Sequence, residues 1–113
     1  MIKIYKKEIL QIEENNIEFV FLTFENALSI YIYEEKPLIG TISLSTPATD
    51  VLPSSTVFMV GTKFDVFIKM AGERIASSLN KIVMLSIYLK NENYLPSIWN
   101  KLEEIIKKGK EES

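Results

Sequence analysis

The sequence predicts an α+β fold, in which an antiparallel sheet of about six strands is flanked by two helices in the order β-β-β-β-β-α-β-α. Three observations support this class. Apolar residues alternate through the N-terminal half, two later segments repeat them at a helical spacing, and one apolar segment of strand character separates those helices. The length of 113 residues suits one hydrophobic core. We expect a single domain over residues 1–108 and a frayed tail at 109–113.

The first three strands are predicted to form a meander. Strands at 17–24 and 27–33 follow a first strand, and the turns between them are short. The first strand carries its apolar residues on one face at a period of two: Ile2, Ile4, Leu10 and Ile12.

The second strand is apolar on both faces. One face carries Ile17, Phe19 and Phe21, and the other carries Val20, Leu22 and Phe24. Because exposed apolar surface costs about 25 cal/mol per Å², both faces need a cover. We therefore expect helices on one side of the sheet and a second sheet or subunit on the other.

The remaining strands are placed by turns and by apolar runs. A fourth strand at 38–45 follows the turn at Lys36-Pro37, and a fifth covers 56–61. The segment between them contains two prolines and fits neither period. A sixth strand at 82–89 is again apolar on both faces.

A first helix is predicted after the fifth strand. Thr62 is the expected N-cap, Asp65 completes a capping pair, and Asn80 is expected in a left-handed conformation after the last turn. Its inward stripe consists of Phe64, Phe67, Ile68, Ala71, Ile75 and Leu79.

A second helix is predicted from about Tyr94 to Lys108, with Asn93 as N-cap. Its inward stripe consists of Leu95, Ile98, Trp99, Leu102, Ile105 and Ile106. This stripe makes Trp99 a core residue rather than part of a ligand site.

The composition excludes several classes of function. A formal net charge of −2 gives no electrostatic reason to bind nucleic acid or an anionic membrane. The chain has no cysteine and no histidine, which excludes disulfides, Cys/His metal sites and nucleophiles activated by histidine. No apolar run approaches the roughly 20 residues of a membrane span, and the start lacks a signal peptide. We expect a cytoplasmic protein.

The Gly61-Thr62-Lys63 stretch is the first candidate site, because it lies between a strand and a helix as phosphate-binding loops do. A phosphate loop needs several glycine amides that converge on the anion, with Ser or Thr after the lysine. Here one glycine precedes the lysine and the threonine comes first. We interpret the stretch as a helix start.

Carboxylates and tyrosines form the other candidate sites. The pairs Glu13-Glu14, Glu34-Glu35 and Glu103-Glu104 fall in predicted turns or on an exposed helix face, where adjacent side chains diverge. We interpret them as solvated surface, and we expect no catalytic residue, metal or cofactor. Tyr31 and Tyr33 share a strand face, but without basic neighbours they suit an edge or interface better than nucleic-acid stacking.

The outer side of the first helix is a candidate surface for self-association. Val66, Met70 and Ser77 lie opposite the core stripe, bordered by Glu73 and Arg74. Scattered exposed apolar residues are the alternative explanation, since these are common. Together with the two-faced strands, the stripe favours an isologous dimer.

The C-terminal two thirds resemble the small proteasome assembly chaperones, the third and fourth of the eukaryotic set. The resemblance covers about residues 38–108 and rests on the stretch "GERIASSLNKIVMLSIYLKN". The residues that carry it are Arg74-Ile75-Ala76, Asn80-Lys81, Val83 and Ser86, with Gly40-Thr41 upstream resembling the third chaperone in particular.

The resemblance implies a non-catalytic protein that binds proteasome α-type subunits and promotes ring assembly, without nucleotide or metal. It also implies a dimer: an archaeal-type chain would pair with itself, and a paralogue could replace the second copy. We expect client contact on the loop from Thr46 to Ser55, at Thr46, Thr49, Asp50, Val51 and Leu52. A plain connector is the alternative explanation of this loop, and the one that its residues favour. A small regulatory or ligand-binding domain, monomeric with an internal cavity, is the alternative function.

Overall fold

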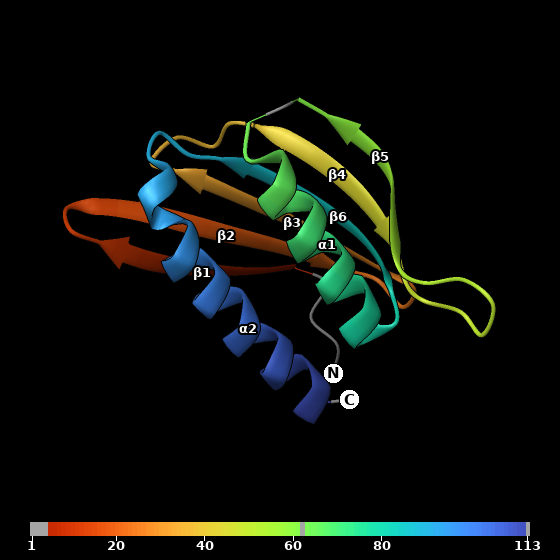
Figure 1. Cartoon of the computed structure of the whole chain (residues 1–113). Coiled ribbons are helices and arrows are strands. Elements are labelled where there is room, and N and C mark those ends of the chain that lie inside the picture. Colours follow the sequence, from red (N-terminus) through yellow and green to blue (C-terminus); the bar gives the residue numbers. More distant parts are fainter. Residues whose placement is uncertain (1–4, 62, 113) are drawn as a thin grey trace.

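The structure is a computed structural model that describes residues 5–61 and 63–112. Over these residues the chain forms six strands, two α-helices and one 3₁₀ turn (Figure 1). The strands are β1 (Tyr5–Ile12), β2 (Asn15–Thr23), β3 (Ala27–Glu34), β4 (Thr41–Thr46), β5 (Ser55–Val60) and β6 (Ile82–Tyr88). The helices are α1 (Asp65–Leu79) and α2 (Leu95–Glu112), and the 3₁₀ turn η1 (Glu92–Tyr94) precedes α2. The α+β class and the predicted succession of strands and helices are confirmed, with η1 as an addition.

The sheet is mixed, so the expectation of a purely antiparallel sheet is wrong. Its strand order is β1-β2-β3-β6-β4-β5. The first three strands form the predicted antiparallel meander, but β3 and β6 run parallel. The reason lies in the topology: β6 returns from α1 and enters between β3 and β4, which are therefore not neighbours. Strand patterns do not encode such an insertion.

The connection from β3 to β4 passes over the end of β6, and Gly40 allows it to run close. A Cβ atom at Gly40 would lie 1.9 Å from the carbonyl oxygen of Ile87. The amide of Gly40 also donates to the Ser86 hydroxyl at 3.2 Å. Because of this connection, β4 begins at Thr41. The sequence predicts that this strand begins at Leu38.

Both helices lie on the same face of the sheet (Figure 1). Helix α1 packs on β4 and β6, and α2 reaches β1, where Lys101 Nζ lies 3.8 Å from Glu8 Oε1. The core lies between the two layers, and its large buried side chains include Phe19, Ile30, Ile68, Leu85 and Ile98. The predicted inward stripes are confirmed, since their residues are buried or packed against this core. Trp99 packs edge-on against Phe67, with ring centroids 6.3 Å apart.

The helix starts differ from the predictions. Thr62, the expected first N-cap, lies outside the described residues, as do Ile2 and Ile4 of the first strand. Helix α1 begins after Phe64, which is left-handed, and the carboxylate of Asp65 accepts a hydrogen bond from the Val66 amide. The predicted left-handed Asn80 is confirmed.

Asn91, rather than Asn93, is the side-chain cap before α2. Its side chain accepts a hydrogen bond from the Asn93 amide at 2.9 Å, at the start of η1. The Asn93 side chain was expected to cap a helix starting at Tyr94, but the first turn there is 3₁₀ and α2 begins one residue later. The helix continues to Glu112, beyond Lys108 where the apolar pattern ends.

Candidate interaction surface

The sheet face opposite the helices is largely apolar, and among the described residues no helix or strand covers it (Figure 1). Residues 36–40 cover part of it at one end, where Tyr33 and Ser86 are buried. Paired residues on neighbouring strands point to the same face. One row of pairs runs from Tyr5 through Leu22, Ser29, Met84 and Leu44 to Phe58, and a second runs from Lys7 through Val20, Tyr31, Ser86 and Ile42 to Val60. We call the surface formed by these residues, with Ile9, Glu18, Tyr33 and Tyr88, the bare face.

Exposure along the bare face is largest at the two edges of the sheet. Tyr5 and Ile9 on β1 are 57% and 56% exposed, and Phe58 and Val60 on β5 are 55% and 49% exposed. Side chains between them, such as Leu44 and Met84, are half-buried because neighbouring strands flank them. Ser29 and Ser86 lie within the two rows, and Ser86 and Tyr33 are buried, so the exposed apolar surface lies mainly on β1 and β5.

The orientation of the β4 side chains distinguishes this face of the sheet from an ordinary solvent-facing one. Thr41, Ser43 and Ser45 point toward α1 and are buried, whereas Ile42 and Leu44 point to the bare face. The Ser43 hydroxyl has no hydrogen-bond partner among the described residues. A strand at a sheet surface normally turns its polar residues to water and its apolar residues to the core. In β4 the polar side chains face the helix layer, and the apolar side chains face the side without helices.

One ion pair interrupts the apolar rows, near the β1 edge. Lys7 Nζ lies 2.7 Å from Glu18 Oε1. The hydrogen bond from Lys7 lowers the pKa of the Glu18 carboxyl, and hydrogen bonding to Tyr33 adds to this effect. The hydrogen bond to Glu18 in turn raises the pKa of Lys7. The pKa of Tyr33 is raised mainly by burial. The two charges on this face therefore neutralise each other.

A shallow hollow lies on the bare face, between its β2 and β3 side chains and the connection at residues 36–40. Its volume is about 290 Å³, and its lining consists of Val20, Tyr31, Tyr33, Pro37, Leu38 and Ile39. The hollow is open to solvent, and Leu38 and Ile39 on its rim are 44% and 59% exposed. Tyr31 and Tyr33 stand on β3, a central strand, so the edge position considered for them does not apply.

The predicted self-association stripe on α1 is exposed and small. Val66 is 78% and Met70 is 44% exposed, and Ser77 is exposed beside them. The bordering charges are engaged within the chain: Glu73 Oε2 accepts from the Thr56 hydroxyl at 2.7 Å, and Arg74 lies 3.5 Å from Glu103. Two apolar side chains therefore form the whole apolar part of this stripe.

The predicted client-contact loop is a structured turn between β4 and β5. The Thr49 hydroxyl oxygen accepts hydrogen bonds from the amides of Val51 and Leu52. The Ser54 hydroxyl lies 2.7 Å from the Thr46 carbonyl and 3.0 Å from that of Glu73, which ties the loop to α1. Asp50 is exposed, and the turn holds Val51 and Leu52 in solvent, 87% and 65% exposed.

Gly61 and Lys63, the described residues of the candidate phosphate loop, serve the fold. Gly61 has a φ of 94°, which favours glycine. The amine of Lys63 donates to the Leu89 carbonyl at 2.9 Å and lies 5.1 Å from the centre of the Phe64 ring. The lysine is thus bound to the protein's own backbone.

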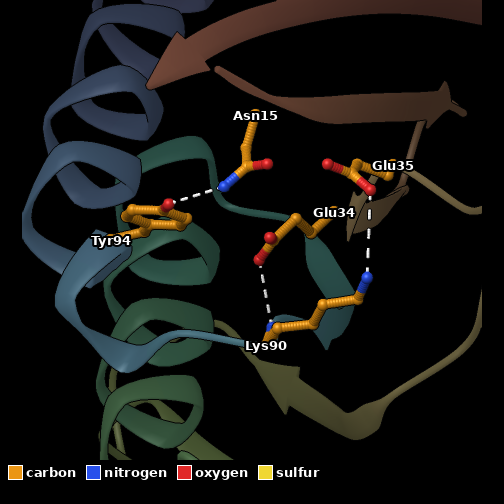
Figure 2. Close-up of polar contacts among 5 residues, drawn as sticks. All are labelled: Asn15, Glu34, Glu35, Lys90 and Tyr94. Atoms are coloured by element: carbon orange, nitrogen blue, oxygen red, sulfur yellow. Dashed lines mark hydrogen bonds and ion pairs between the residues drawn. The ribbon is translucent and has the colours of Figure 1, made fainter. Parts of the chain in front are cut away.

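The interpretation of Glu34 as solvated surface is wrong. It is 3% exposed, and its Oε1 accepts from the Lys90 amide at 3.1 Å (Figure 2). Glu35 is exposed and lies 3.8 Å from the Lys90 amine. Nearby, the Asn15 side chain on β2 donates to the Tyr94 hydroxyl at 2.7 Å. This hydrogen bond connects η1, just before α2, to the sheet. Glu34 was misplaced because β3 runs one residue further than its pattern indicates.

Sequence reasoning did not select the outward residues of β4, β5 and β6 that complete the bare face. The signal was available: Ile42 and Leu44 alternate with hydroxyl residues, which marks an apolar side on β4. Among the described residues, no group of three or more acidic side chains is placed to hold a metal ion. Neither helix within the described ranges has the length and apolarity needed to cross a membrane.

Comparison with models of protein families found no match, and comparison with curated proteins likewise found none.

Proposed function

We propose that this protein acts by binding other polypeptides and carries out no reaction of its own. The bare face is the observation that carries this proposal. A sheet face of six strands, about 4.8 Å apart and roughly 20 Å long, covers on the order of 600 Å². Its exposed apolar side chains, which include Tyr5, Ile9, Phe58 and Val60, are of the kind that commonly marks a protein contact.

The more specific proposal is an assembly chaperone for proteasome α-type subunits, working as a dimer in the cytoplasm. The resemblance across residues 38–108 supports it. Such a protein uses binding energy only: it holds one subunit so that the correct neighbour binds and an incorrect one clashes. The turn that displays Val51 and Leu52 supports a client contact at the β4–β5 loop, because a fixed turn loses little entropy on binding.

The experiment is direct binding of the purified chain to purified proteasome α-type subunits, measured by biolayer interferometry. Val51→Asp should weaken binding at least tenfold, because it places a charge where an apolar contact is expected. Val66→Asp is the matched control, since Val66 is 78% exposed on α1 and Val51 is 87% exposed. It should change the affinity less than twofold.

Two results would contradict the specific proposal. Absence of binding to every α-type subunit at tens of micromolar would remove the proteasome client. Equal effects of the two aspartate variants would remove the loop as the contact.

A small-ligand function has one observation in its favour, the tyrosine-lined hollow of about 290 Å³. The hollow is open rather than enclosed, which suits a small ligand less well than a cavity does. A monomeric chain whose melting temperature rises with an aromatic metabolite would favour this function over polypeptide binding.

A further inference from the structure

We propose that the free edge of β5 binds an extended segment of another polypeptide, which joins the sheet as one further strand beside β5. The segment that fits is apolar at alternate positions, and it has neither charge nor proline where it pairs. The inference rests on the proposed function, polypeptide binding, and names where and how a partner is held.

The main chain of β5 is paired on one side only. Strand β5 is the last in the sheet order, and among the described residues its backbone pairs with β4 alone (Figure 1). Alternate residues of an edge strand direct their N–H and C=O groups away from the sheet, where another extended main chain can pair with them. The geometry of this edge therefore specifies a strand, and not a helix, as the element that binds it.

The two edges of the sheet differ in charge. Strand β1, at the other edge, carries Lys6, Lys7 and Glu8. Charged side chains, lysine above all, prevent further strands from adding to an edge. Strand β5 has the sequence STVFMV, which contains no charge and no proline. Of the two edges, β1 has this protection and β5 lacks it.

The exposed side chains of β5 indicate the chemistry of the partner. Val57, Phe58 and Val60 are 59%, 55% and 49% exposed. A strand added about 4.8 Å away would place its own side chains beside them as cross-strand pairs. The polar Thr56 is engaged within the chain, where its hydroxyl donates to Glu73 at 2.7 Å. A partner with apolar residues at every second position would therefore cover the apolar side chains of β5.

A bulge interrupts the pairing of β5 with β4 near the loop that joins them. The register shifts between Leu44 and Ser45, which leaves Val57 without a partner on β4. Bulges hinder strand addition where they twist an edge. Residues 58–60 lie beyond the bulge and pair with β4 in regular register, so we place the contact with the added strand there.

The position of this edge fits the proposed client contact. Strand β5 begins just after the loop that displays Val51 and Leu52, and Figure 1 shows this loop projecting beyond the end of β5. A polypeptide that contacts the loop can therefore continue along the edge of β5.

The first experiment selects random peptides, displayed on phage, for binding to the immobilised full chain. Peptides of about ten residues are longer than the six residues of β5 and can cover the whole edge. Enriched peptides should have apolar residues at every second position and no proline among them. Enrichment of apolar residues at a helical spacing would overturn the inference, as would no enrichment over an uncoated surface.

Synthetic copies of an enriched peptide then test whether its main chain pairs with β5. Methylation of every second amide nitrogen removes the hydrogen-bond donors from one edge of the peptide strand and leaves its side chains unchanged. Methylation of one alternating set should weaken binding at least tenfold, whereas methylation of the other set, which faces solvent, should change it less than twofold. Equal effects of the two sets would rule out main-chain pairing.

Two matched variants locate the peptide on the sheet. Val57→Lys gives β5 the kind of charge that β1 carries, and it should weaken peptide binding at least tenfold. Ile9→Lys is the control on the other edge, because Ile9 is 56% and Val57 is 59% exposed, and it should change binding less than twofold. Circular dichroism should show an unchanged fold for both variants. A larger effect of Ile9→Lys would overturn the assignment to β5.

Amide hydrogen exchange of the unmodified chain locates the peptide without any substitution. The bound peptide should slow exchange in β5 at least tenfold and leave exchange in β1 unchanged. Slower exchange in β1 with none in β5 would contradict the proposed edge.

The outcomes separate this inference from the proposed function. Peptide binding along β5 without binding of any α-type subunit would support the inference and remove the proteasome client. Subunit binding that Val57→Lys leaves unchanged, with no enriched peptide, would overturn the inference and leave the proposed function standing. A doubled mass by light scattering that Val57→Lys halves and Ile9→Lys does not would assign the edge to a second copy, and would also overturn the inference.

Discussion

The two faces of the sheet are built from the same strands but meet different surroundings. On β2, Phe19 is fully buried under the helices, and Val20 beside it is half-buried on the bare face. The helices cover one face only because both lie on the same side of the sheet (Figure 1). The difference teaches that an apolar strand pattern shows that a cover is needed but not which element, or which molecule, provides it.

The largest expected difference between the two faces is in the free energy of unfolding that is lost when neighbouring β2 residues are truncated to alanine. Phe19→Ala should lower the free energy of unfolding by about 3–5 kcal/mol, because it leaves a cavity in the core. Val20→Ala should cost about 1 kcal/mol or less in the monomer, where the side chain already meets water. Urea titration at a concentration low enough to favour the monomer measures both. Equal costs would mean that the two faces are buried alike.

A smaller effect is expected where α1 packs on the polar side of β4. A Cβ atom at Gly72 would lie 2.7 Å from the Ser45 hydroxyl oxygen and 3.2 Å from that of Ser43. Gly72→Ala should therefore lower the free energy of unfolding by about 1–3 kcal/mol through overpacking.

Gly109→Ala on α2 is the matched control for Gly72→Ala. Among the described residues, its Cβ would meet Leu79 alone, at an ordinary 3.7 Å. Within a helix this change should raise the free energy of unfolding by about 0.5–1 kcal/mol. Thermal denaturation of both variants checks the pair. A stabilised Gly72→Ala would show that α1 is free to move away from β4.

The smallest effect is expected at the ion pair on the bare face. Folding lowers the pKa of Glu18, so the pair stabilises the folded state above the unfolded pKa of this carboxyl. That stability is lost as the pH falls through the lower, folded pKa. Glu18→Gln should therefore lower the melting temperature slightly near neutral pH, and this difference should shrink as the pH falls through the folded pKa of Glu18.

Melting curves of Glu18→Gln and of the unmodified chain at several pH values measure this dependence. A difference between Glu18→Gln and the unmodified chain that stays constant with pH would contradict the assigned pKa direction.

The local elements were predictable because they depend on residues close together in the chain. The spacing of Ile68, Ala71 and Ile75 predicts the buried side of α1, and Asn80 predicts its end. Turn residues separate β1, β2 and β3. Element ends were less predictable, as Glu34 shows, because a terminal residue can be drawn into a strand by a distant partner such as Lys90.

The candidate site was predictable only in part. The two faces of β2 indicate that the sheet needs a cover on both sides, and the stripe with Val66 and Met70 is exposed as predicted. The larger surface was missed because it joins β4, β5 and β6 to β2 and β3. Its extent depends on the strand order, and distant segments meet in that order for reasons that no short window contains.

The sequence by itself determined the α+β class, the succession of elements, the inward stripes of the helices and the presence of apolar residues on both sides of the strands. Hydrophobic periodicity and turn chemistry act over a few residues, so they can be seen along one chain. Only the tertiary structure decided that β6 lies between β3 and β4, that both helices lie on one side, and that Ile42 and Leu44 point away from them. These features arise when distant segments compete to bury apolar surface, and the packing of the whole chain decides that competition.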